Sequence, residues 1–460
     1  MTNHQDYLII KGAGVNNTEL VGEGQDLLLR GSAPNLLEIS NLTMMNGYDN
    51  GPGGRCLSVG SKELLLKNLV ITDCKSPDYA SGGASIGIID SGIVVLDSVI
   101  VKNCESDIDA GWGGSDDTGA CAVYIQGTYG GGYYHGEIIV RNSRFSNNIN
   151  GGIKIRGNAT FESSVIDSNL FAGGIISSGV LTINNSQIYH NERNHPDMVW
   201  YQHRGGGIFA YGEVNINKSA IWENVASSTS SSGLYTEGGD INLSNSVFYD
   251  NSIYLNGTAD LMSINSILYG ENFGISGLEE RVNIFYSNID GGWDGEGNIE
   301  ADPLFYDPDN GNFNLNPNSP CIDAGTAFYV SEGDTLVNMD PDDYIGSAPD
   351  MGTIEYDPLS IDDEAAIPLD YALHQNYPNP FNPVTRIIFD LPELTDVEIL
   401  VYNLLGKQVR KLVNESMNPG KYSIIWNGTD NLGMPLSSGV YIYRLVTPEF
   451  SQSKKLILLK

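Results

Sequence analysis

From Asn41 onward, short apolar runs end at polar corners in a phrase that repeats. The phrase is a polar residue, usually followed by Ser, then an apolar run closed by Asn or Asp, and its shortest steps are 20 to 22 residues. Its copies are NLVITD from Asn68, DSVIVKN from Asp97, NSRFSNN from Asn142, SSVIDSN from Ser163, NSQIYHN from Asn185, KSAIWEN from Lys218, NSVFYDN from Asn245 and NSILYGEN from Asn265. A period of about 21 residues with two or three short strand runs per unit is typical of one β-helix coil. The pattern therefore predicts an all-β chain whose larger part is a right-handed parallel β-helix.

The coils of such a rod stack on one another. Each strand pairs with its copy one coil on, about 4.8 Å away, and alternate apolar residues point inward and form columns. Asn at the same corner of successive coils can form a ladder of side-chain amides, which would account for its recurrence. The unpaired sheet edges at the two ends of the rod need caps that prevent them from pairing with other chains.

The longer repeats carry most of their additional residues between the Asn corner and the next Gly-rich strand. These segments are Gly47–Arg55, Lys75–Gly82, Glu105–Gly119, Asn191–Arg204 and Val225–Ser232. If the register of the coils is kept, all five segments leave the rod at one corner. They then form one wall along the rod, which we call the loop wall.

The loop wall contains the candidate ligand-binding residues. Aromatic rings beside acids and amides can hold sugar rings, because they combine an apolar face with hydrogen-bonding groups. The candidates for glycan binding are Trp112, Trp200, Tyr201, His203 and Arg204. No cofactor is required, but Ca²⁺ is a candidate ion because it prefers hard oxygen ligands, which are offered by Asp107, Asp109, Asp116 and Asp117. The alternative is that the rings fold back on the rod and the carboxylates are solvated.

Charge and cysteine content restrict the partners. A net charge of −33 and a pI of about 4.3 argue against nucleic acid or an anionic membrane as partner. There is no apolar run long enough to span a membrane, and the first residues lack the features of a signal peptide. The five cysteines are predicted as buried thiols, with a Cys74–Cys104 disulfide as the alternative. Zinc is not expected because the chain has no CxxC element.

The predicted rod resembles the pectate-lyase-like superfamily of parallel β-helices, many of which bind or cleave polysaccharides. Polygalacturonase-like members carry a G-H-G element and pectate lyases an R-x-P-x-x-R element, and this sequence has neither. The fold does not decide the function, and any carboxylate pair chosen among so many acids would be arbitrary. A polysaccharide lyase or glycoside hydrolase is therefore an alternative function, with its catalytic residues unknown.

From Asn298 the repeat gives way to a segment rich in Asp, Pro and Gly. Ile299–Tyr356, with its DPLF, SPCIDAG and EY elements, resembles the closing segment of many surface β-helix proteins. That resemblance implies that the segment seals the last coil, and we expect most of its aspartates to form turns. The opening residues YLIIKGAGVNNTEL resemble an early coil. We therefore expect that the native N-terminus, with its signal peptide, is missing from this chain.

The end of the chain follows a different pattern. Asn376–Pro383 (NYPNPFNP) has three prolines in eight residues, which excludes a helix or a central strand. Six or seven short strand runs separated by turns follow, and Trp426 is available for their core. This arrangement predicts a small β-sandwich of immunoglobulin type.

Asn376–Lys460 resembles the type IX secretion C-terminal sorting domain of Gram-negative bacteria, in its Ig-like variant. The matching stretches are NYPNPFNP, VYNLLGKQV, GKYSIIWNGTDNLGMPLSSGVYIYRL and KKLILLK. In this resemblance the G-x-Y element and the basic end are filled by Gly439, Val440 and Tyr441 and by Lys454, Lys455 and Lys460. The resemblance implies that the domain directs its cargo across the outer membrane, so that the protein is secreted or displayed at the cell surface. We interpret the proline-rich segment as a stiff border between cargo and sorting domain.

Three parts are therefore predicted: a β-helix over 1–356 with a cap at about 299–356, an acidic linker over 357–375, and a sorting domain over 376–460. The expected partners are the type IX secretion machinery and an extracellular polysaccharide or another surface ligand, bound through the loop wall. Neither nucleic acid nor a membrane span is expected. A structural spacer or adhesin without a small-ligand site is the remaining hypothesis.

Overall fold

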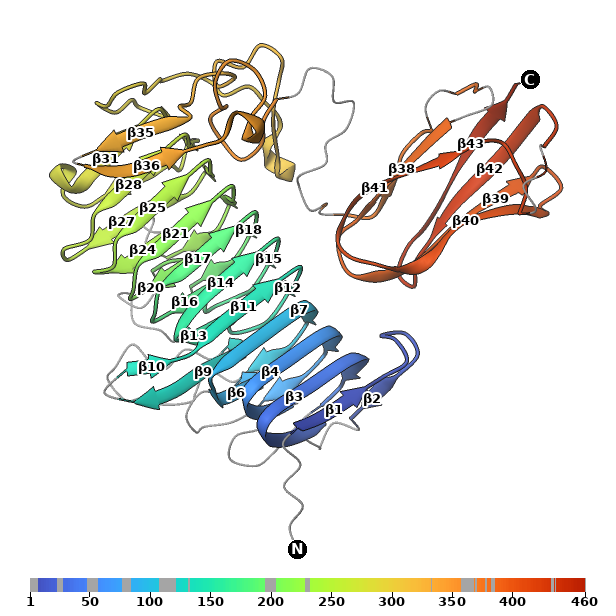
Figure 1. Cartoon of the computed structure of the whole chain (residues 1–460), viewed down its shortest axis with the longest axis horizontal. Helices are drawn as coiled ribbons and strands as arrows, with labels where there is room; N and C mark the ends of the chain where they lie inside the picture. The colour runs from blue at the N-terminus through green and yellow to red at the C-terminus, as the bar shows by residue number, and fades with distance from the viewer. Residues whose placement is uncertain are drawn as a thin grey trace, which may run out of the picture. The chain divides into compact units, whose positions relative to one another are not determined.

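The computed structural model describes most of the chain. The described residues are 7–22, 28–47, 57–76, 84–106, 121–130, 133–194, 204–227, 232–331, 333–356, 368, 370–376, 379–381, 385–431, 434 and 436–459. The chain divides into two compact units, Met1–Pro358 and Leu359–Lys460 (Figure 1).

The first unit is a parallel β-helix in which each strand pairs with the strand one coil on, so that three stacks of strands run along the rod (Figure 1). Stack A consists of β6 (Ala84–Ser91), β9 (Cys121–Gly130), β13 (Ile153–Arg156), β16 (Ile175–Ser177), β20 (Ile208–Ala210), β24 (Leu234–Glu237), β27 (Ser252–Asn256) and β30 (Gly274–Ser276). Stack B consists of β11 (Glu137–Arg141), β14 (Asn158–Glu162), β17 (Leu181–Asn184), β21 (Val214–Asn217), β25 (Ile241–Ser244), β28 (Leu261–Ile264) and β31 (Val282–Phe285). Stack C consists of β12 (Arg144–Ser146), β15 (Val165–Asp167), β18 (Gln187–Tyr189), β22 (Ala220–Trp222), β26 (Val247–Tyr249), β29 (Ile267–Tyr269) and β32 (Asn288–Ile289).

The first coils are built from longer strands. β3 (Leu29–Met45) and β4 (Leu57–Thr72) run through all three stacks, and β7 (Ile93–Lys102) runs through stacks B and C. β1 (Tyr7–Lys11) and β2 (Glu19–Val21) pair in parallel with β3. The predicted all-β fold with a parallel β-helix is therefore confirmed.

The interior of the rod is a continuous column of aliphatic side chains. In stack A the residues Val123, Ile153, Ile175, Ile208 and Leu234 stand in register, and each is at most 1% exposed. Strand alternation points these residues inward, and the coil spacing places each on the next. Every coil therefore buries the apolar face of its neighbours, which a single coil could not do alone.

One corner of each coil, between stacks B and C, uses left-handed backbone at the residue that opens the repeated phrase. The residues with positive φ at this corner are Asn41, Asn68, Ser98, Asn142, Ser163, Asn185, Lys218, Asn245 and Asn265, and each opens its phrase except Ser98, which is the second residue of DSVIVKN. Asn adopts this conformation more readily than most residues, because its short side chain hydrogen-bonds locally. The bend therefore explains why the phrase so often begins with Asn.

The predicted amide ladder is confirmed at the corner between stacks C and A. Side-chain Nδ2 donates to the Oδ1 of the next coil from Asn148 to Asn169 (2.9 Å), Asn169 to Asn191 (2.8 Å), Asn191 to Asn224 (2.9 Å) and Asn224 to Asn251 (2.7 Å). All five side chains are at most 3% exposed. Buried amides in water-free surroundings need such partners, so each ladder Asn depends on the coils on both sides.

A second ladder, which the sequence analysis did not predict, follows the corner between stacks B and C. The backbone N–H of each serine donates to the hydroxyl of the serine one coil on, at 3.0 to 3.3 Å. Its members are Ser143, Ser164, Ser186, Ser219, Ser246, Ser266 and Ser287. The serine in the repeated phrase is thus a structural residue of the corner.

Cys74 and Cys104 occupy the position of the ladder Asn in two earlier coils. The backbone N–H of Cys104 donates to Oδ1 of Asn148 at 3.0 Å. Cys74 lies in a disulfide, whereas Cys104 and Cys321 are buried thiols. The alternative Cys74–Cys104 bond therefore does not form, and the prediction that all cysteines are thiols was wrong for Cys74.

The segment after the last coil contacts both the end and the side of the rod. β33 (Phe305–Asp307) and β34 (Asn312–Leu315) form an antiparallel hairpin whose Phe313 ring lies 5.3 Å from the ring of Trp222 in stack C. β35 (Phe328–Ser331) pairs with β36 (Asp334–Asn338), and the ring of Tyr329 lies 4.8 Å from that of Phe285 in β31. Trp222, which points away from the interior, is consequently fully buried.

The second unit is a β-sandwich, as predicted. One antiparallel sheet has the order β37 (Ala372–Leu373), β38 (Thr385–Leu391), β41 (Gly420–Trp426). The other has the order β40 (Gln408–Met417), β39 (Thr395–Asn403), β42 (Gly439–Val446), β43 (Ser451–Leu458). Trp426, predicted for the core, is 1% exposed, and its ring lies 5.8 Å from that of Tyr441.

The proline-rich segment is part of this sandwich. The N–H of Phe381 donates to the carbonyl of Ile457 at 2.9 Å, and its carbonyl accepts from the N–H of Leu459 at 2.8 Å. The Oδ1 of Asn379 accepts from the N–H of Ile457 at 2.9 Å. The interpretation of the segment as a border was therefore wrong. Its described residues 379–381 lie along the outer edge of β43, where the Asn379 side chain supplies hydrogen bonds that proline cannot make.

Candidate functional site

The five long loops begin and end at equivalent places in the coil. Each follows the ladder corner and precedes a strand of stack A, as β19 (Glu192–Arg193) precedes β20 and β23 (Val225–Ala226) precedes β24. The roots of neighbouring loops also pair, β5 (Lys75–Ser76) with β8 (Glu105–Ser106), and β19 with β23. The register thus places the roots of the loop wall along one edge of stack A.

Most of the predicted ligand-binding residues lie outside the described residues. These are Trp112, Trp200, Tyr201 and His203 for the glycan, and Asp107, Asp109, Asp116 and Asp117 for Ca²⁺. Arg204 is described and stands just before β20. Within the described ranges, no group of three or more His, Cys, Asp or Glu side chains is placed to hold a metal ion. The glycan and Ca²⁺ sites remain predictions, and Arg204 is the residue whose surroundings can be examined.

The outer face of stack A carries two rows of side chains, because every second residue of a strand points outward and the coils stand in register. The first row, nearer the loop roots, contains Tyr124, Lys154, Ile176, Phe209, Tyr235 and Tyr254. The second row contains Gln126, Arg156, Tyr211, Glu237 and Asn256.

Three residues of the first row form an aromatic ladder. The ring centroids of Phe209 and Tyr235 are 5.1 Å apart, those of Tyr235 and Tyr254 are 5.3 Å apart, and both pairs are stacked. Phe209 is 5% exposed and Tyr235 is fully buried, although both point outward. The guanidinium of Arg193 lies 4.4 Å from the ring centroid of Phe209, within the range of a cation–π contact. The loop roots therefore cover the first row.

Arg204 joins this ladder through hydrogen bonds. Its Nη1 donates to the Tyr235 hydroxyl at 2.5 Å, and that hydroxyl donates to Oε2 of Glu237 at 2.6 Å. Asn256 Nδ2 donates to Oε1 of Glu237 at 2.9 Å. Burial, and then the hydrogen bond to Glu237, raises the pKa of Tyr235 above its ordinary value. The phenol of Tyr235 therefore stays protonated. The hydrogen bonds from Tyr235 and Asn256 fix the Glu237 carboxylate in the second row.

The second row remains accessible. Gln126, Arg156, Tyr211 and Asn256 are half-buried, and Glu237 is exposed. Tyr211 packs edge-to-face on Phe209, with ring centroids 5.0 Å apart, so the covered first row supports the row beside it. Amide, guanidinium, phenol and carboxylate groups thus line one strip of the rod, a set that can both donate and accept hydrogen bonds.

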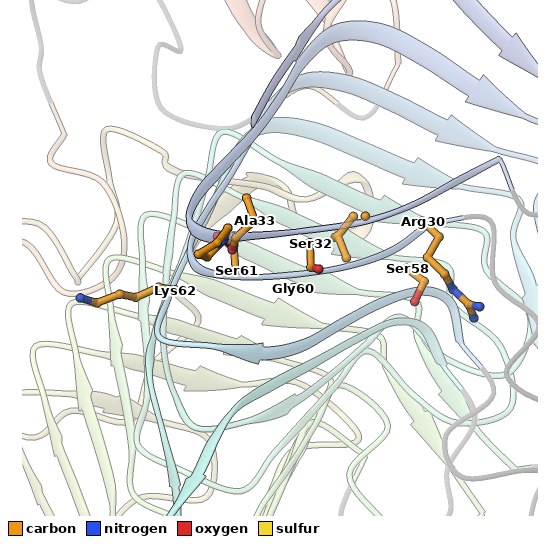
Figure 2. A pocket seen from close by; sticks show the side chains of 10 residues that line it. Arg30, Ser32, Ala33, Ser58, Gly60, Ser61 and Lys62 are labelled. Atoms are coloured by element: carbon orange, nitrogen blue, oxygen red, sulfur yellow. Dashed lines mark hydrogen bonds between the residues drawn. The ribbon is translucent and has the colours of Figure 1, made fainter. Parts of the chain in front are cut away.

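A shallow depression of about 540 Å³ lies on the same face of the first coils, in β3 and β4 (Figure 2). The register places Arg30 beside Ser58 and Ser32 beside Gly60 there. Several later coils carry larger side chains at these outward positions, such as Tyr124 and Phe209, whereas Ser32, Ser58 and Gly60 are small and leave the surface hollow beside Arg30. In Figure 2 the guanidinium of Arg30 lies beside Ser58, and Lys62 points away from the other side chains.

The predicted sorting residues lie on two paired strands of the sandwich. Gly439–Tyr441 at the start of β42 stand opposite Leu456–Leu458 at the end of β43. Tyr441 is 5% exposed, while Lys454 is half-buried, Lys455 is exposed and Lys460 lies outside the described residues. The buried Tyr441 of the G-x-Y element therefore supports the terminal strand from inside, whereas Lys455 faces solvent.

Two carboxyl groups lie close together in the cap, Asp350 buried and Glu355 half-buried. Asp350 is 1% exposed and accepts from the N–H of Asp323 at 2.7 Å. The carboxyl of Glu355 accepts from the N–H of Asp350 at 3.1 and 3.2 Å. Burial, and then the charge of Asp350, raises the pKa of Glu355 to about 7. The cap therefore contains a group that changes its charge near neutral pH.

The substitution Glu355→Gln should alter the pH dependence of stability. Because folding raises the pKa of Glu355 from 4.5 to about 7, its protonation favours the native state. This contribution to the stability of the native state is fully present below pH 4.5 and is lost as the pH rises to about 7. Gln keeps a carbonyl acceptor and does not ionise. We expect the variant to be about 1–2 kcal/mol more stable than the parent at pH 8 and equally stable at pH 4. Thermal unfolding at both pH values measures this, and parallel pH profiles would contradict it.

Comparison with known proteins identifies the second unit. The model of the family described as "Secretion system C-terminal sorting domain" matches residues 375–459. No curated protein matches the chain, and the resemblance of the rod to the pectate-lyase-like superfamily is not confirmed by a family match. In the described part of the chain, no helix is long and apolar enough to cross a membrane.

Three solved structures show limited likeness. Dimeric latent PorU of Porphyromonas gingivalis is 21% identical over 18% of this chain and 9% of its own, with a TM-score of 0.17. PorZ of the same bacterium, an essential surface component of the type IX secretion system, is 19% identical over 20% of this chain and 11% of its own, with a TM-score of 0.15. The tailspike protein gp49 of Acinetobacter baumannii bacteriophage Fri1, a capsular polysaccharide depolymerase, is 9% identical over 100% of this chain and 81% of its own, with a TM-score of 0.23.

The chain spans only a small part of PorU and PorZ, so what those proteins do is not transferred to it. The sorting-domain match agrees with the resemblance predicted from the sequence over nearly the same residues. Residues 375–459 thus carry a secretion system C-terminal sorting domain, which marks the chain as cargo of the type IX machinery that is secreted or exported to the cell surface.

Proposed function

We propose that the β-helix is an exported glycan-binding rod that holds an extracellular polysaccharide along the outer face of stack A, beside the loop wall. The observation that carries this proposal is the second row, where Gln126, Arg156, Tyr211 and Asn256 are half-buried and Glu237 is exposed. Export through the sorting domain supports it, because it brings this face into contact with extracellular polysaccharide.

The chemistry of the strip suits a sugar polymer. Sugars present hydroxyls that donate and accept, and apolar ring faces. The Gln126 amide donates and accepts, the Arg156 guanidinium donates and the Glu237 carboxylate accepts, while Tyr211 adds an aromatic plane. The rod repeats these positions about every 4.8 Å, so a linear chain can meet similar contacts at successive coils. Arg30 and Lys62, beside the depression, give one end of the face a positive charge in a chain of net charge −33.

Binding without cleavage is the better-supported form of the proposal. Glycoside hydrolysis generally needs two carboxyl groups about 5 to 9.5 Å apart on either side of the scissile bond. In the two rows as far as the structure describes them, Glu237 is the one carboxylate. It accepts hydrogen bonds from Tyr235 and Asn256, which hold it in place. A structural spacer would not need such a row.

The double substitution Tyr211→Ala/Asn256→Ala should weaken glycan binding about tenfold or more, since about 1.4 kcal/mol of lost contact suffices. Binding of parent and variant to a glycan array and to capsular and surface polysaccharides measures this. Asn242→Ala is the control, because Asn242 is exposed on stack B and pairs with Asn215. A parent that binds no glycan, or a variant that binds equally well, would refute the proposal.

A further inference from the structure

One end of the sandwich presents two leucines that the fold does not require. The turn between β39 and β40 carries Leu404 and Leu405, which are 68% and 92% exposed. The turn is held by Asn403, whose Oδ1 accepts from the N–H groups of Leu405 and Lys407 at 3.0 Å each. Gly406 adopts the left-handed conformation with φ 76°. Because Asn and Gly build the turn, the two leucines between them contribute nothing to it.

The chain places further apolar side chains at the same end. Asn403 pairs with Tyr441 near the start of β42, and Gly439 pairs with Leu458 at the end of β43. The turn therefore projects from the end at which the terminal strand finishes. Leu459 is 48% exposed there. Met434, 62% exposed, belongs to the loop that precedes β42 and whose Asn431 donates to the carbonyl of Val409 in β40 at 3.2 Å. We call Leu404, Leu405, Met434 and Leu459 the apolar end.

The balance of basic and acidic residues in this domain differs from that in the rest of the protein. Residues 371–460 contain nine of the 24 Lys and Arg residues but only seven of the 57 Asp and Glu residues. Lys407 is exposed at the base of the turn, and Lys455 is exposed on the terminal strand. A partner with an apolar pocket and an acidic rim would bind this end and would be repelled by the acidic β-helix.

Among the residues that carry the family resemblance, the apolar ones of the two last strands are not accessible in the folded domain. Tyr441 is 5% exposed, and Leu456 and Leu458 are at most 1% exposed. The proline-rich segment covers the outer edge of β43 through Asn379 and Phe381. A receptor that binds the folded domain can therefore contact the apolar end but not the buried side chains of Tyr441, Leu456 and Leu458.

We propose that the apolar end is the surface through which the folded sorting domain docks onto a protein component of the type IX secretion machinery. Leu404 and Leu405 enter an apolar pocket of that component, and Lys407 meets acidic residues at its rim. The sorting-domain match supplies the class of partner. Exposed leucines on a rigid turn lose little conformational freedom on binding, and a few central apolar residues commonly carry most of an interface's affinity. This surface is separate from the proposed glycan site.

The test is export of the full chain, fused behind a signal peptide of the host, from a bacterium that has a type IX system. Leu404→Ser/Leu405→Ser should lower the exported fraction about tenfold and leave the chain in the periplasm. The matched control is Val21→Ser/Leu278→Ser, which replaces residues of the first unit that are 54% and 53% exposed, and it should export normally. Thermal unfolding of the purified variants should be unchanged, because the replaced side chains are exposed.

Three outcomes would overturn the proposal. Normal export of Leu404→Ser/Leu405→Ser would show that the machinery does not use the apolar end. A parent dimer that becomes a monomer in this variant while export stays normal would assign the end to a second copy of the chain. If the double variant unfolds at a lower temperature than the parent, export of the single variant Leu405→Ser is measured instead. A side chain that is 92% exposed cannot support the core, so this variant keeps the fold. Its normal export would equally refute the proposal.

Discussion

Replacing Asn191 with alanine is expected to destabilise the β-helix by about 3–5 kcal/mol. Its Oδ1 accepts from the Nδ2 and N–H of Asn169 at 2.8 and 3.2 Å. Its Nδ2 donates to the carbonyls of Ile166 and Tyr189 and to Oδ1 of Asn224, at 2.8 to 3.0 Å. Asn191 is fully buried, so alanine leaves several polar groups without a partner and without water. Denaturant-induced unfolding followed by far-UV circular dichroism measures the loss.

Asn242→Ala provides the comparison for this prediction. Asn242 also joins an Asn–Asn pair between coils, through a 2.9 Å bond from its Nδ2 to Oδ1 of Asn215, but it is exposed. Water replaces the lost bond there, so the change should stay within about 0.5 kcal/mol. Equal effects of the two substitutions would show that burial of the ladder does not account for its stability.

Phe381→Ala is expected to destabilise the sorting domain by about 3–5 kcal/mol. Phe381 is 1% exposed, and its ring lies 5.5 Å from that of Trp426. The cavity left by alanine would loosen the proline-rich segment, whose backbone at Phe381 bonds to Ile457 and Leu459. A domain of this size has about 5–15 kcal/mol of stability in total. Hydrogen exchange in the full chain should therefore show much faster exchange along β43.

Leu405→Ala is the control for this second prediction. Leu405 is 92% exposed, so its truncation should change the stability of the domain by no more than about 0.5 kcal/mol. Protection of the β43 amides should remain as in the parent. Undiminished protection in Phe381→Ala would mean that the proline-rich segment does not stabilise the terminal strand.

The periodic parts of the fold could be predicted from the sequence because their causes are local. The corner that opens each phrase needs left-handed backbone, and Asn142, Asn185 and Asn245 show that preference directly. The ladder Asn recurs in every such phrase from Asn148 to Asn251, so its stacking follows from the period alone. The same reasoning located the roots of the loop wall, since the surplus residues fall at one point of the coil.

The contacts outside that period could not be predicted. Trp222 looks like any apolar strand residue, yet it is buried by Phe313 from the cap. A Cβ at Gly311 would lie 2.7 Å from the Trp222 ring, and its φ of 73° also favours glycine. The proline-rich segment has no strand pattern, because its hydrogen bonds to β43 come largely from side chains and a single bridging residue.

In the candidate site, too, single residues could be predicted from the sequence but their contacts with other coils could not. Arg204 was predicted from its position in a long loop, but its partner Tyr235 lies 31 residues away. The two rows on stack A were missed because their members are one coil apart, and each belongs to a strand whose outward residues look unremarkable alone. A comparison of outward positions at the coil period would have shown aromatic residues at 209, 235 and 254.

The sequence alone was sufficient to predict an all-β chain with a parallel β-helix and a C-terminal sorting domain. Strand alternation, corner conformation and the sorting motifs are properties of short segments, which is why they can be read from the sequence. Only the tertiary structure decided which outward side chains are covered, where the proline-rich segment lies and which end of the sandwich is exposed. These depend on packing between residues tens of positions apart, such as Phe381 against Trp426, and the free energy of such contacts is set by burial that no local pattern encodes.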